Sequence, residues 1–273
     1  MSLKHFFKTA ISGLKANKMR SALTMLGIII GITAIILVMS VGQGAEDLIL
    51  NQMRGIGSQT ISIEPGRQPK GPADFVEMFS DSLKEKELKA LSNKNNAPGL
   101  AVLTPTVMLP GTISYENDTY RATVLGLSPN ITEILDVYPN EGIFFQEDDV
   151  RQKSSVAVIG SDVKTELFGD SDAVGKKIKI KNKNFKVIGV IAPKGQVATL
   201  NVDKMAVIPY TTAQYYLLGI NYYHAIIAKA ESEEIIPQAV TDITKTLRNL
   251  HRITDPEKDD FHIITQAEIA KRV

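Results

Sequence analysis

Cysteine is absent from all 273 residues of the chain. Disulfide bonds, thiol chemistry and cysteine-based metal sites are therefore excluded within it. The absence does not decide the compartment, because an extracytoplasmic domain tolerates disulfides without requiring them at this size. About 230 residues lie beyond the most apolar stretch of the chain, and that length is enough to bury a hydrophobic core.

Nucleotide-binding and catalytic motifs are lacking as well. No G-x-x-x-x-G-K-[ST] sequence occurs, and Gly175–Lys176–Lys177 lacks both the upstream glycine and the serine or threonine that binds magnesium. The histidines are scattered without the spacing of a metal site or a catalytic triad: His5, His224, His251 and His262. We therefore expect no catalytic residue, no cofactor and no metal here, and any ATP hydrolysis to belong to a partner subunit.

The acidic run Glu147–Asp148–Asp149 is a candidate for a calcium site or an acid–base site. It lacks the interleaved oxygen ligands of a calcium-binding loop. A solvated turn is therefore the favoured interpretation of this run.

Charge is missing from residues 21–45, and Ala22–Val41 contains only three polar residues, Thr24, Thr33 and Ser40. At about 1.5 Å per residue, a helix of this length spans the roughly 30 Å hydrocarbon core of a bilayer. The stretch predicts a transmembrane helix over residues 21–45. Three alternatives are a cleaved signal peptide, whose apolar region is shorter at about 7–15 residues, a buried core helix, which usually has a polar face, and a mitochondrial presequence. A presequence would have more arginines than the single Arg20 and would not contain a full bilayer span.

The charges that flank this stretch indicate its orientation. Five bases and no acid precede it: Lys4, Lys8, Lys15, Lys18 and Arg20. Because bases beside a first span stay on the cytoplasmic side, we expect a plasma-membrane protein with a cytoplasmic N-terminus and an extracytoplasmic main domain. Of 31 basic and 30 acidic residues, all acids and all but five bases follow the stretch, so the remainder carries a net charge of −4. That balance argues against a nucleic-acid partner.

Residues 1–20 carry an amphipathic pattern. Lysines occupy other positions than the apolar residues. The apolar residues recur at spacings of three and four: Leu3, Phe6, Phe7, Ala10, Ile11 and Leu14. The pattern predicts a helix that lies in the cytoplasmic headgroup layer and contacts membrane lipid. A short packed helix is the alternative.

Two features of the apolar stretch concern its packing and its continuation. Gly27 and Gly31 form a G-x-x-x-G pair, a spacing that lets another transmembrane helix approach closely, although two unrelated small residues give the same pattern. Beyond the stretch, Leu48, Ile49 and Met53 continue a helical spacing over residues 46–58. We therefore expect a helical stalk that carries the span into the aqueous side.

The rest of the chain alternates strands and helices, which predicts an α+β domain. Period-two alternation and apolar runs predict strands over 59–64, 101–107, 112–127, 155–160, 174–180, 185–191, 205–208, 223–228 and 261–265. Helices are expected over 82–92 with a capping box at Ser82 and Glu85, over 161–168, over 211–218, and after Ser232. Breaks are expected at Pro110–Gly111, at Glu116–Asn117–Asp118 within the stretch 112–127, and in the loop 65–74.

Six lysines lie close together in the sequence: Lys176, Lys177, Lys179, Lys181, Lys183 and Lys186. Alternation places Lys177, Lys179 and Lys181 on one face of a strand, with Ile178 and Ile180 on the other. Binding to anionic lipid or to a polyanionic envelope polymer is one interpretation. A solvated edge strand that resists strand-to-strand aggregation is the favoured one.

The ordered set of sequence strings resembles a known family. The opening LKANKMRSALTMLGIIIGITAIILVMSVGQGAE resembles the start of permeases of the MacB/FtsX-like ABC transporter family. The later strings TISIEPG, VIGSDVKTELFG, AVGKKIKI, FKVIGV and VIPY are similar to the extracytoplasmic core domain of that family.

The resemblance implies a two-lobed extracytoplasmic domain. Residues 59–107 and 223–265 would form a porter-like α/β lobe, and residues 108–222 an inserted, mostly β lobe. It also implies an ABC ATPase subunit, a second permease copy and a periplasmic adaptor protein as partners. Such permeases pass ATP-driven motion of membrane helices through the stalk to the outer domain, for export or extraction of a substrate.

That family places three more membrane helices after the outer domain, whereas no apolar run of membrane length follows Val41 here. We therefore expect residues 266–273 to begin a helix that is cut short, and the chain to be the N-terminal portion of a permease. The alternative is a single-pass envelope adaptor, whose outer domain binds a partner protein without coupling to an ATPase.

Overall fold

The computed structural model describes residues 17–54, 59–67, 80–197 and 200–265. The predicted helix over residues 1–20, the loop 65–74 and the helix start at 266–273 therefore lie largely or wholly outside the described residues. The chain divides into two units, Met1–Asn51 and Gln52–Val273, which are taken in turn.

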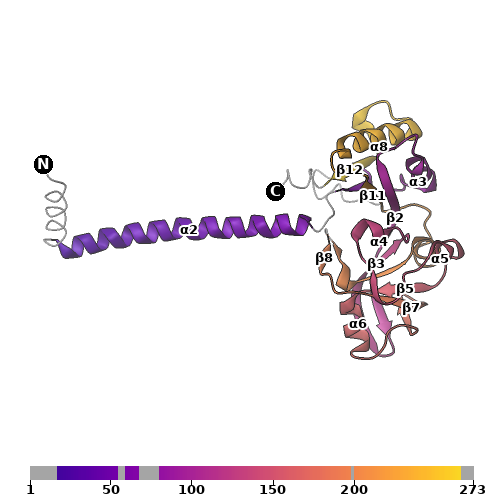
Figure 1. Cartoon of the computed structure of the whole chain (residues 1–273), viewed down its shortest axis with the longest axis horizontal. Coiled ribbons are helices and arrows are strands. Elements are labelled where there is room, and N and C mark those ends of the chain that lie inside the picture. The colour runs from indigo at the N-terminus through magenta and orange to yellow at the C-terminus, as the bar shows by residue number, and fades with distance from the viewer. Residues whose placement is uncertain (1–16, 55–58, 68–79, 198–199, 266–273) are drawn as a thin grey trace. The chain divides into compact units, whose positions relative to one another are not determined.

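The described part of the first unit is formed almost entirely by one long helix, α2 (Lys18–Arg54), drawn in indigo and violet in Figure 1. Its 37 residues continue without a break from the predicted span into the predicted stalk, a length of about 55 Å at 1.5 Å per residue. The Thr24 hydroxyl donates to the carbonyl oxygens of Arg20 and Ser21, at 2.8 and 3.0 Å. A hydroxyl satisfied by its own helix costs little in an apolar environment.

The second unit begins with an antiparallel sheet covered by two helices. Its strands, in the order β12, β1, β11 and β2, are Phe261–Thr265, Thr60–Pro65, Ala225–Ala230 and Leu100–Tyr115. Helices α3 (Glu85–Ser92) and α8 (Ile236–His251) pack against each other and against this sheet (Figure 1). Their apolar faces are buried in the core: Leu88 in part, and Leu91, Ala239, Ile243 and Leu247 fully.

Five further strands of the second unit form a closed ring with β2, in which each strand is hydrogen-bonded to the next. In order around the ring they are β3 (Asp118–Leu127), β10 (Met205–Pro209), β5 (Val156–Ile159), β7 (Lys183–Ile191) and β6 (Lys177–Ile180). Strand β6 pairs with β7 on one side and with Ile113 and Ser114 of β2 on the other, which closes the ring. The favoured interpretation of the lysine run as an edge strand is therefore wrong at Lys179 and Ile180, which are paired on both sides, while the described pairings of Lys177 and Ile178 are with β7 alone.

Alternate residues of these strands fill the interior of the ring, as period two requires. Examples that are at most 1% exposed are Ile178, Ile180, Phe185, Val187, Ala206 and Ile208. The opposite faces of β3, β5 and β10 bury a second apolar cluster. The short elements in this half are α4 (Ile131–Leu135), β4 (Pro139–Gly142), α5 (Glu147–Gln152), α6 (Ser161–Phe168), β8 (Gln196–Val197), β9 (Leu200–Asn201) and α7 (Tyr210–Thr212), with a π-helix at Ala213–Leu218.

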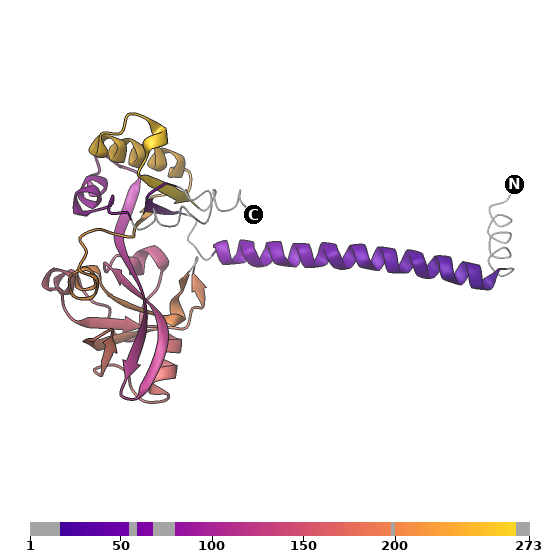
Figure 2. The same cartoon turned by 180° about the vertical axis from the view of Figure 1, so that it is seen from behind.

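Strand β2 belongs to both halves, and Figures 1 and 2 show it running from the half that carries α3 and α8 toward the half that carries α6. Its residues up to Thr106 pair with β11, and those from Val107 onward pair with β3. The predicted break at Pro110–Gly111 is wrong. Pro110 pairs with Thr123 of β3, while none of the pairings described puts a strand on its other side, so its missing N–H breaks no ladder there.

Helix starts also differ from the sequence prediction. Helix α3 begins at Glu85, not at Ser82, because the Ser82 hydroxyl donates to the carbonyl of Asp260 at 2.8 Å. The returning carboxylate is that of Glu87, which accepts from the Lys84 N–H at 2.8 Å. Helix α8 begins at Ile236, four residues after the predicted cap.

The acidic run 147–149 forms the first turn of α5, where the prediction was a turn. The Asp149 carboxylate accepts from the Gln146 N–H at 3.0 Å and so caps the helix. Acids are favourable in the first turn of a helix because its N-terminal end is partly positive.

Gly126 of β3 allows α7 and the π-helix to pack directly on the ring. A β-carbon there would lie 2.7 Å from Ala213 Cβ and 3.0 Å from Tyr210 Cα. We expect Gly126→Ala to lower the free energy of unfolding by about 1–3 kcal/mol, because a packed core yields little to added volume. Chemical unfolding of the full chain in detergent micelles measures the change.

Gly111→Ala is the matched control, because its β-carbon would meet Val124 Cγ2 at an ordinary 3.9 Å. We expect that variant to change stability by less than about 0.5 kcal/mol. Equal losses in the two variants would contradict the packing account.

Candidate functional site

An exposed apolar helix is the most conspicuous functional feature of the first unit. In the described residues, Lys18–Gly44 is the one helix long and apolar enough to cross a membrane, and none of its most apolar part is buried. Ile28, Ile35 and Val38 have 62%, 62% and 73% of their surface exposed. A contiguous apolar surface of this extent requires lipid or another protein to cover it.

The predicted packing glycines lie on this exposed surface. A β-carbon built on Gly27 or Gly31 meets no atom within 4 Å, so another helix is free to approach there. The predicted stalk residues Leu48, Ile49 and Met53 belong to the same uninterrupted helix. Their roles in packing and in coupling stay predictions.

A buried polar cluster in the second unit was missed in the sequence. His251 of α8 lies between two carboxylates, with Nδ1 2.6 Å from Asp260 Oδ1 and Nε2 3.0 Å from Glu87 Oε1. The side chain of Glu87 has no exposed surface, and that of His251 is 7% exposed. Glu87 and His251 are 164 positions apart, so no local spacing could have revealed the cluster.

Neighbouring contacts extend this cluster into the turn before β12. Arg248 donates two hydrogen bonds to the Asp259 carboxylate, at 2.8 and 2.7 Å, and these bonds raise the pKa of Arg248 above its ordinary value. Both ring nitrogens of His251 face carboxylates, so the imidazole is not paired with a nucleophile. The cluster therefore joins α3, α8 and the segment before β12, and its chemistry is that of a structural lock.

A second polar contact joins α3 to the start of β11. The Tyr223 hydroxyl donates to Glu85 Oε2 at 2.6 Å, and the Tyr223 N–H donates to the Leu83 carbonyl at 2.8 Å. Burial raises the pKa of the Tyr223 phenol far above its ordinary value, and the bond to Glu85 raises it further. The phenol therefore stays protonated and keeps its donor.

His224 holds the backbone where β2 changes partner. Its Nδ1 accepts from the Met108 N–H at 2.9 Å, and the backbone N–H of His224 donates to the Thr106 carbonyl at 2.9 Å. Burial lowers the pKa of His224, which favours the neutral ring that can accept this bond. These bonds give His224 a structural role, which is to hold the backbone of β2 at Thr106 and Met108.

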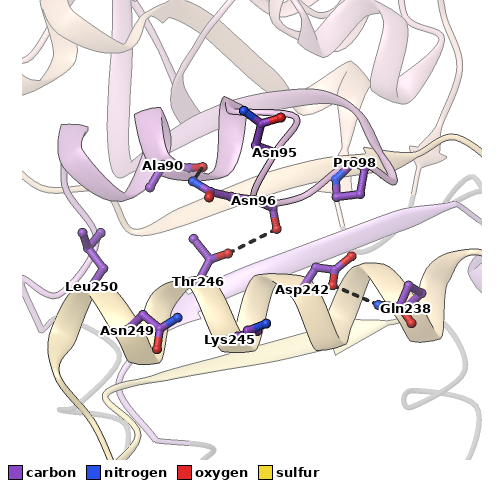
Figure 3. Close-up of a pocket in the computed structure, with 10 residues that line it drawn as sticks. All are labelled: Ala90, Asn95, Asn96, Pro98, Gln238, Asp242, Lys245, Thr246, Asn249 and Leu250. Atoms are coloured by element: carbon purple, nitrogen blue, oxygen red, sulfur yellow. Dashed lines mark hydrogen bonds between the residues drawn. The ribbon is translucent and has the colours of Figure 1, made fainter.

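A pocket of about 600 Å³ lies between α8 and the turn after α3 (Figure 3). Figure 3 shows Thr246 of α8 bonded to the Asn96 carbonyl across it, at 3.3 Å, and Gln238 bonded to Asp242 along the helix. Its lining mixes polar side chains with Ala90, Pro98 and Leu250. The described residues also contain no group of three or more histidine, cysteine or acidic side chains placed to hold a metal.

Comparison with known proteins identifies the second unit. A family model described as the MacB-like periplasmic core domain matches residues 21–246. The chain belongs to this family. Its membership confirms the resemblance predicted from the sequence, and the MacB-like core domain corresponds to most of the mixed helix-and-strand unit described above.

Curated MacB-like relatives align over nearly the whole chain. The macrolide export ATP-binding/permease protein MacB of Bdellovibrio bacteriovorus is 30% identical over 257 residues, which cover 94% of this chain and 39% of the relative. The protein of the same name from Chlorobium phaeobacteroides is 32% identical over 271 residues, which cover 97% of this chain and 40% of the relative. The chain thus spans about two fifths of the length of these relatives.

Solved structures show the same fold. The periplasmic region of MacB from Actinobacillus actinomycetemcomitans matches with a TM-score of 0.67 and 23% identity, over 82% of this chain and 96% of that one. The extracellular domain of the ABC-type transporter YknZ from Gram-positive bacteria matches with a TM-score of 0.60 and 16% identity, over 76% of this chain and 100% of that one. The predicted fold class, an apolar N-terminal helix followed by a domain of this type, is confirmed.

The buried cluster gives a direct test of its structural role. We expect His251→Ala to lower the free energy of unfolding by about 1–3 kcal/mol, because the buried Glu87 carboxylate loses one hydrogen-bond partner and keeps the Lys84 N–H and the Lys86 ammonium. Urea unfolding of the full chain in detergent micelles measures the loss. Adding Glu87→Gln to this variant should recover part of the lost stability, since the buried negative charge of Glu87 is then removed.

Arg151→Ala serves as the control for that experiment. Arg151 pairs with Asp148 on the surface, where the two side chains are 74% and 70% exposed. Exposed pairs contribute at most about 1 kcal/mol, so this variant should unfold nearly as the parent does. A His251→Ala loss no larger than the control would rule out the lock.

Proposed function

We propose that this chain is the N-terminal portion of a permease subunit of a MacB-like ABC transporter. In this proposal it passes ATP-driven motion to its extracytoplasmic domain for export or extraction of a substrate. The observation that carries the proposal is the continuity of α2, which runs through the apolar segment and on to Arg54 in a chain with a MacB-like core domain. The curated relatives are themselves described as ATP-binding/permease proteins.

The helix supplies the mechanical element. The apolar segment ends at Gly44, and α2 continues for about ten more residues, or roughly 15 Å, before Arg54. A hydrogen-bonded helix keeps its length and axis under load, whereas a flexible linker would absorb the displacement in its own coil. We propose that Leu48, Ile49 and Met53 lie in a stalk that transmits movement of the span.

The orientation follows from the flanking charges. Five bases precede the span and Glu46 and Asp47 follow it, so the N-terminus lies in the cytoplasm and the core domain outside the plasma membrane. Residues 1–20 then contact lipid at the inner surface. The name of the matching family, a periplasmic core domain, agrees with this placement.

Three protein partners belong to the proposal. An ABC ATPase subunit supplies the nucleotide-binding motif that this sequence lacks. A second permease copy covers the exposed surface around Gly27 and Gly31, and a periplasmic adaptor protein contacts the outer domain. No observation favours nucleic acid as a further partner.

The two lobes predicted from the sequence also belong to the proposal. The porter-like lobe would comprise residues 59–107 and 223–265, and the inserted lobe residues 108–222. The change of partner along β2 between Thr106 and Val107 supports a boundary at that position. Motion that reaches one lobe is passed to the other through the backbone of this strand.

Proline substitutions test the stalk. We expect Leu48→Pro or Ile49→Pro, in the full-length permease with its ATPase, to lower substrate transport about tenfold or more, because proline breaks or kinks the helix. ATP hydrolysis should persist, since the ATPase is untouched. Leu48→Ala and Ile49→Ala, which keep the helix, are the matched controls. Unchanged transport in the proline variants would contradict the proposed role of the stalk.

Isoleucine substitutions test the packing glycines. We expect Gly27→Ile with Gly31→Ile to weaken self-association of the full chain in lipid vesicles about tenfold, because bulk holds the helix backbones apart. Energy transfer between donor- and acceptor-labelled copies measures association. Gly42→Ile with Gly44→Ile is the control, since those glycines are equally open but lie two residues apart. Equal association in both double variants would exclude a glycine interface.

A further inference from the structure

The lysine run of β6 and β7 presents an unusual concentration of positive charge. Ile178 and Ile180 of β6 are buried, with 0% and 1% of their surface exposed. Lys177 and Lys179, which alternate with them along the strand, are exposed. Lys177 lies directly opposite Lys186 of β7, which is also exposed. Like charges on directly opposite residues of neighbouring strands destabilise a sheet.

No acid offsets this charge within the described part of the chain. The ion pairs found there involve other lysines and arginines, such as Lys84, Lys89 and Lys94, which pair with Asp81, Glu85 and Glu231. Protection of an open edge does not explain Lys179, because Lys179 and Ile180 are paired on both sides, whereas Lys177 pairs with β7 alone among the pairings described. The sheet therefore carries an electrostatic cost that an external anion would remove.

Two exposed tyrosines adjoin the lysines. Tyr215 and Tyr216, on the π-helix, are 62% and 43% exposed, and their rings meet edge to face with centroids 4.9 Å apart. Lys183 Nζ lies 3.1 Å from the centroid of Tyr216, and Lys153 Nζ lies 4.1 Å from that of Tyr215. A π-helix turn frequently marks a functional site.

One contact joins the turn between β6 and β7 to this π-helix. Lys181 Nζ donates to the Leu217 carbonyl at 3.2 Å. Lys183 pairs with the buried Ile180, so it leaves β7 on the opposite face from Lys177, Lys179 and Lys186, and the turn at Lys181 joins the two groups. The name Lys/Tyr surface is used below for these two groups together: Lys177, Lys179 and Lys186 on the outer face, and Lys153, Lys181, Lys183, Tyr215 and Tyr216 around the π-helix.

We propose that the Lys/Tyr surface binds a linear polymer that carries repeated phosphate groups, of the kind found in a cell envelope. Alternate residues of a strand lie about 6.7 Å apart, so Lys177 and Lys179 place charge at regular intervals along a line. The exposed rings add flat faces for the uncharged parts of the polymer. An extended, open row of this kind matches a chain-like ligand better than a single small ion.

The composition of the surface favours such a polymer over a lipid bilayer. A surface that inserts into a bilayer presents leucine, phenylalanine or tryptophan beside its bases. The large exposed side chains here are tyrosines, and the isoleucines of β6 face the core. The proposal does not depend on transport, because binding to the outer domain needs no ATPase.

The test measures binding of fluorescently labelled poly(glycerol phosphate) to the full chain in nanodiscs of zwitterionic lipid. We expect Lys177→Gln, Lys179→Gln and Lys186→Gln together to weaken binding about 10–100-fold, and added salt to weaken binding to the parent chain steeply. The control carries Lys84→Gln, Lys89→Gln and Lys94→Gln, which change the net charge equally and should leave binding as in the parent. Equal losses in both variants would show a net-charge effect and overturn the proposal.

The tyrosines and the choice of ligand need separate measurements. Tyr215→Ala with Tyr216→Ala should weaken binding about tenfold at high salt, where screening leaves the contribution of the rings. Polyglutamate and phosphatidylglycerol nanodiscs are the competing probes. Binding of either one as tight as that of poly(glycerol phosphate), or no binding of the polymer to the parent chain, would refute the assignment.

Discussion

The second unit depends on the backbone pairing of one strand. Leu100–Tyr115 (β2) gives its first residues to the antiparallel sheet with β11 and its later residues to the ring with β3 and β6. A strand that pairs continuously cannot bend sharply without giving up ladder hydrogen bonds. The relative orientation of the two halves is therefore set by the twist of β2 and not by side-chain contacts alone.

Polar contacts reinforce that arrangement at places where helices meet strands. His251 links Glu87 of α3 to Asp260 before β12, and Tyr223 links Glu85 of α3 to the start of β11. The fully buried Glu87 carboxylate favours this one arrangement, because a displaced α8 would take away its contact with His251. These contacts fix α3 and α8 on the sheet, and they leave the ring of strands without such a lock.

Local pattern in the sequence predicted the elements whose causes are local. The strand at 261–265 and the end of α6 before Gly169, which has a positive φ, both follow from neighbouring residues. The apolar segment was visible because its composition is so uniform. Resemblance to a family, and not periodicity, indicated the kind of domain.

Features caused by distant residues escaped prediction. Ser82 has the sequence of a helix cap but bonds to Asp260, 178 positions away. Pro110 interrupts the strand pattern but has no strand beside it to disturb on one side in the described sheet. The closure of the ring through β6, and with it the meaning of the lysine run, depends on pairing between segments about 65 residues apart, which no local signal encodes.

The order of strands in the ring has a consequence for how the protein is made. Strand β10, at residues 205–209, sits between β3 and β5, and β12 completes the other sheet at residue 265. Neither half can reach its final pairing while these late segments are still being synthesised. Local hairpins such as β2–β3 and β6–β7 can pair early, but the strand edges that β10 and β12 cover stay open during synthesis, and each half completes its pairing only when nearly all of the chain is present.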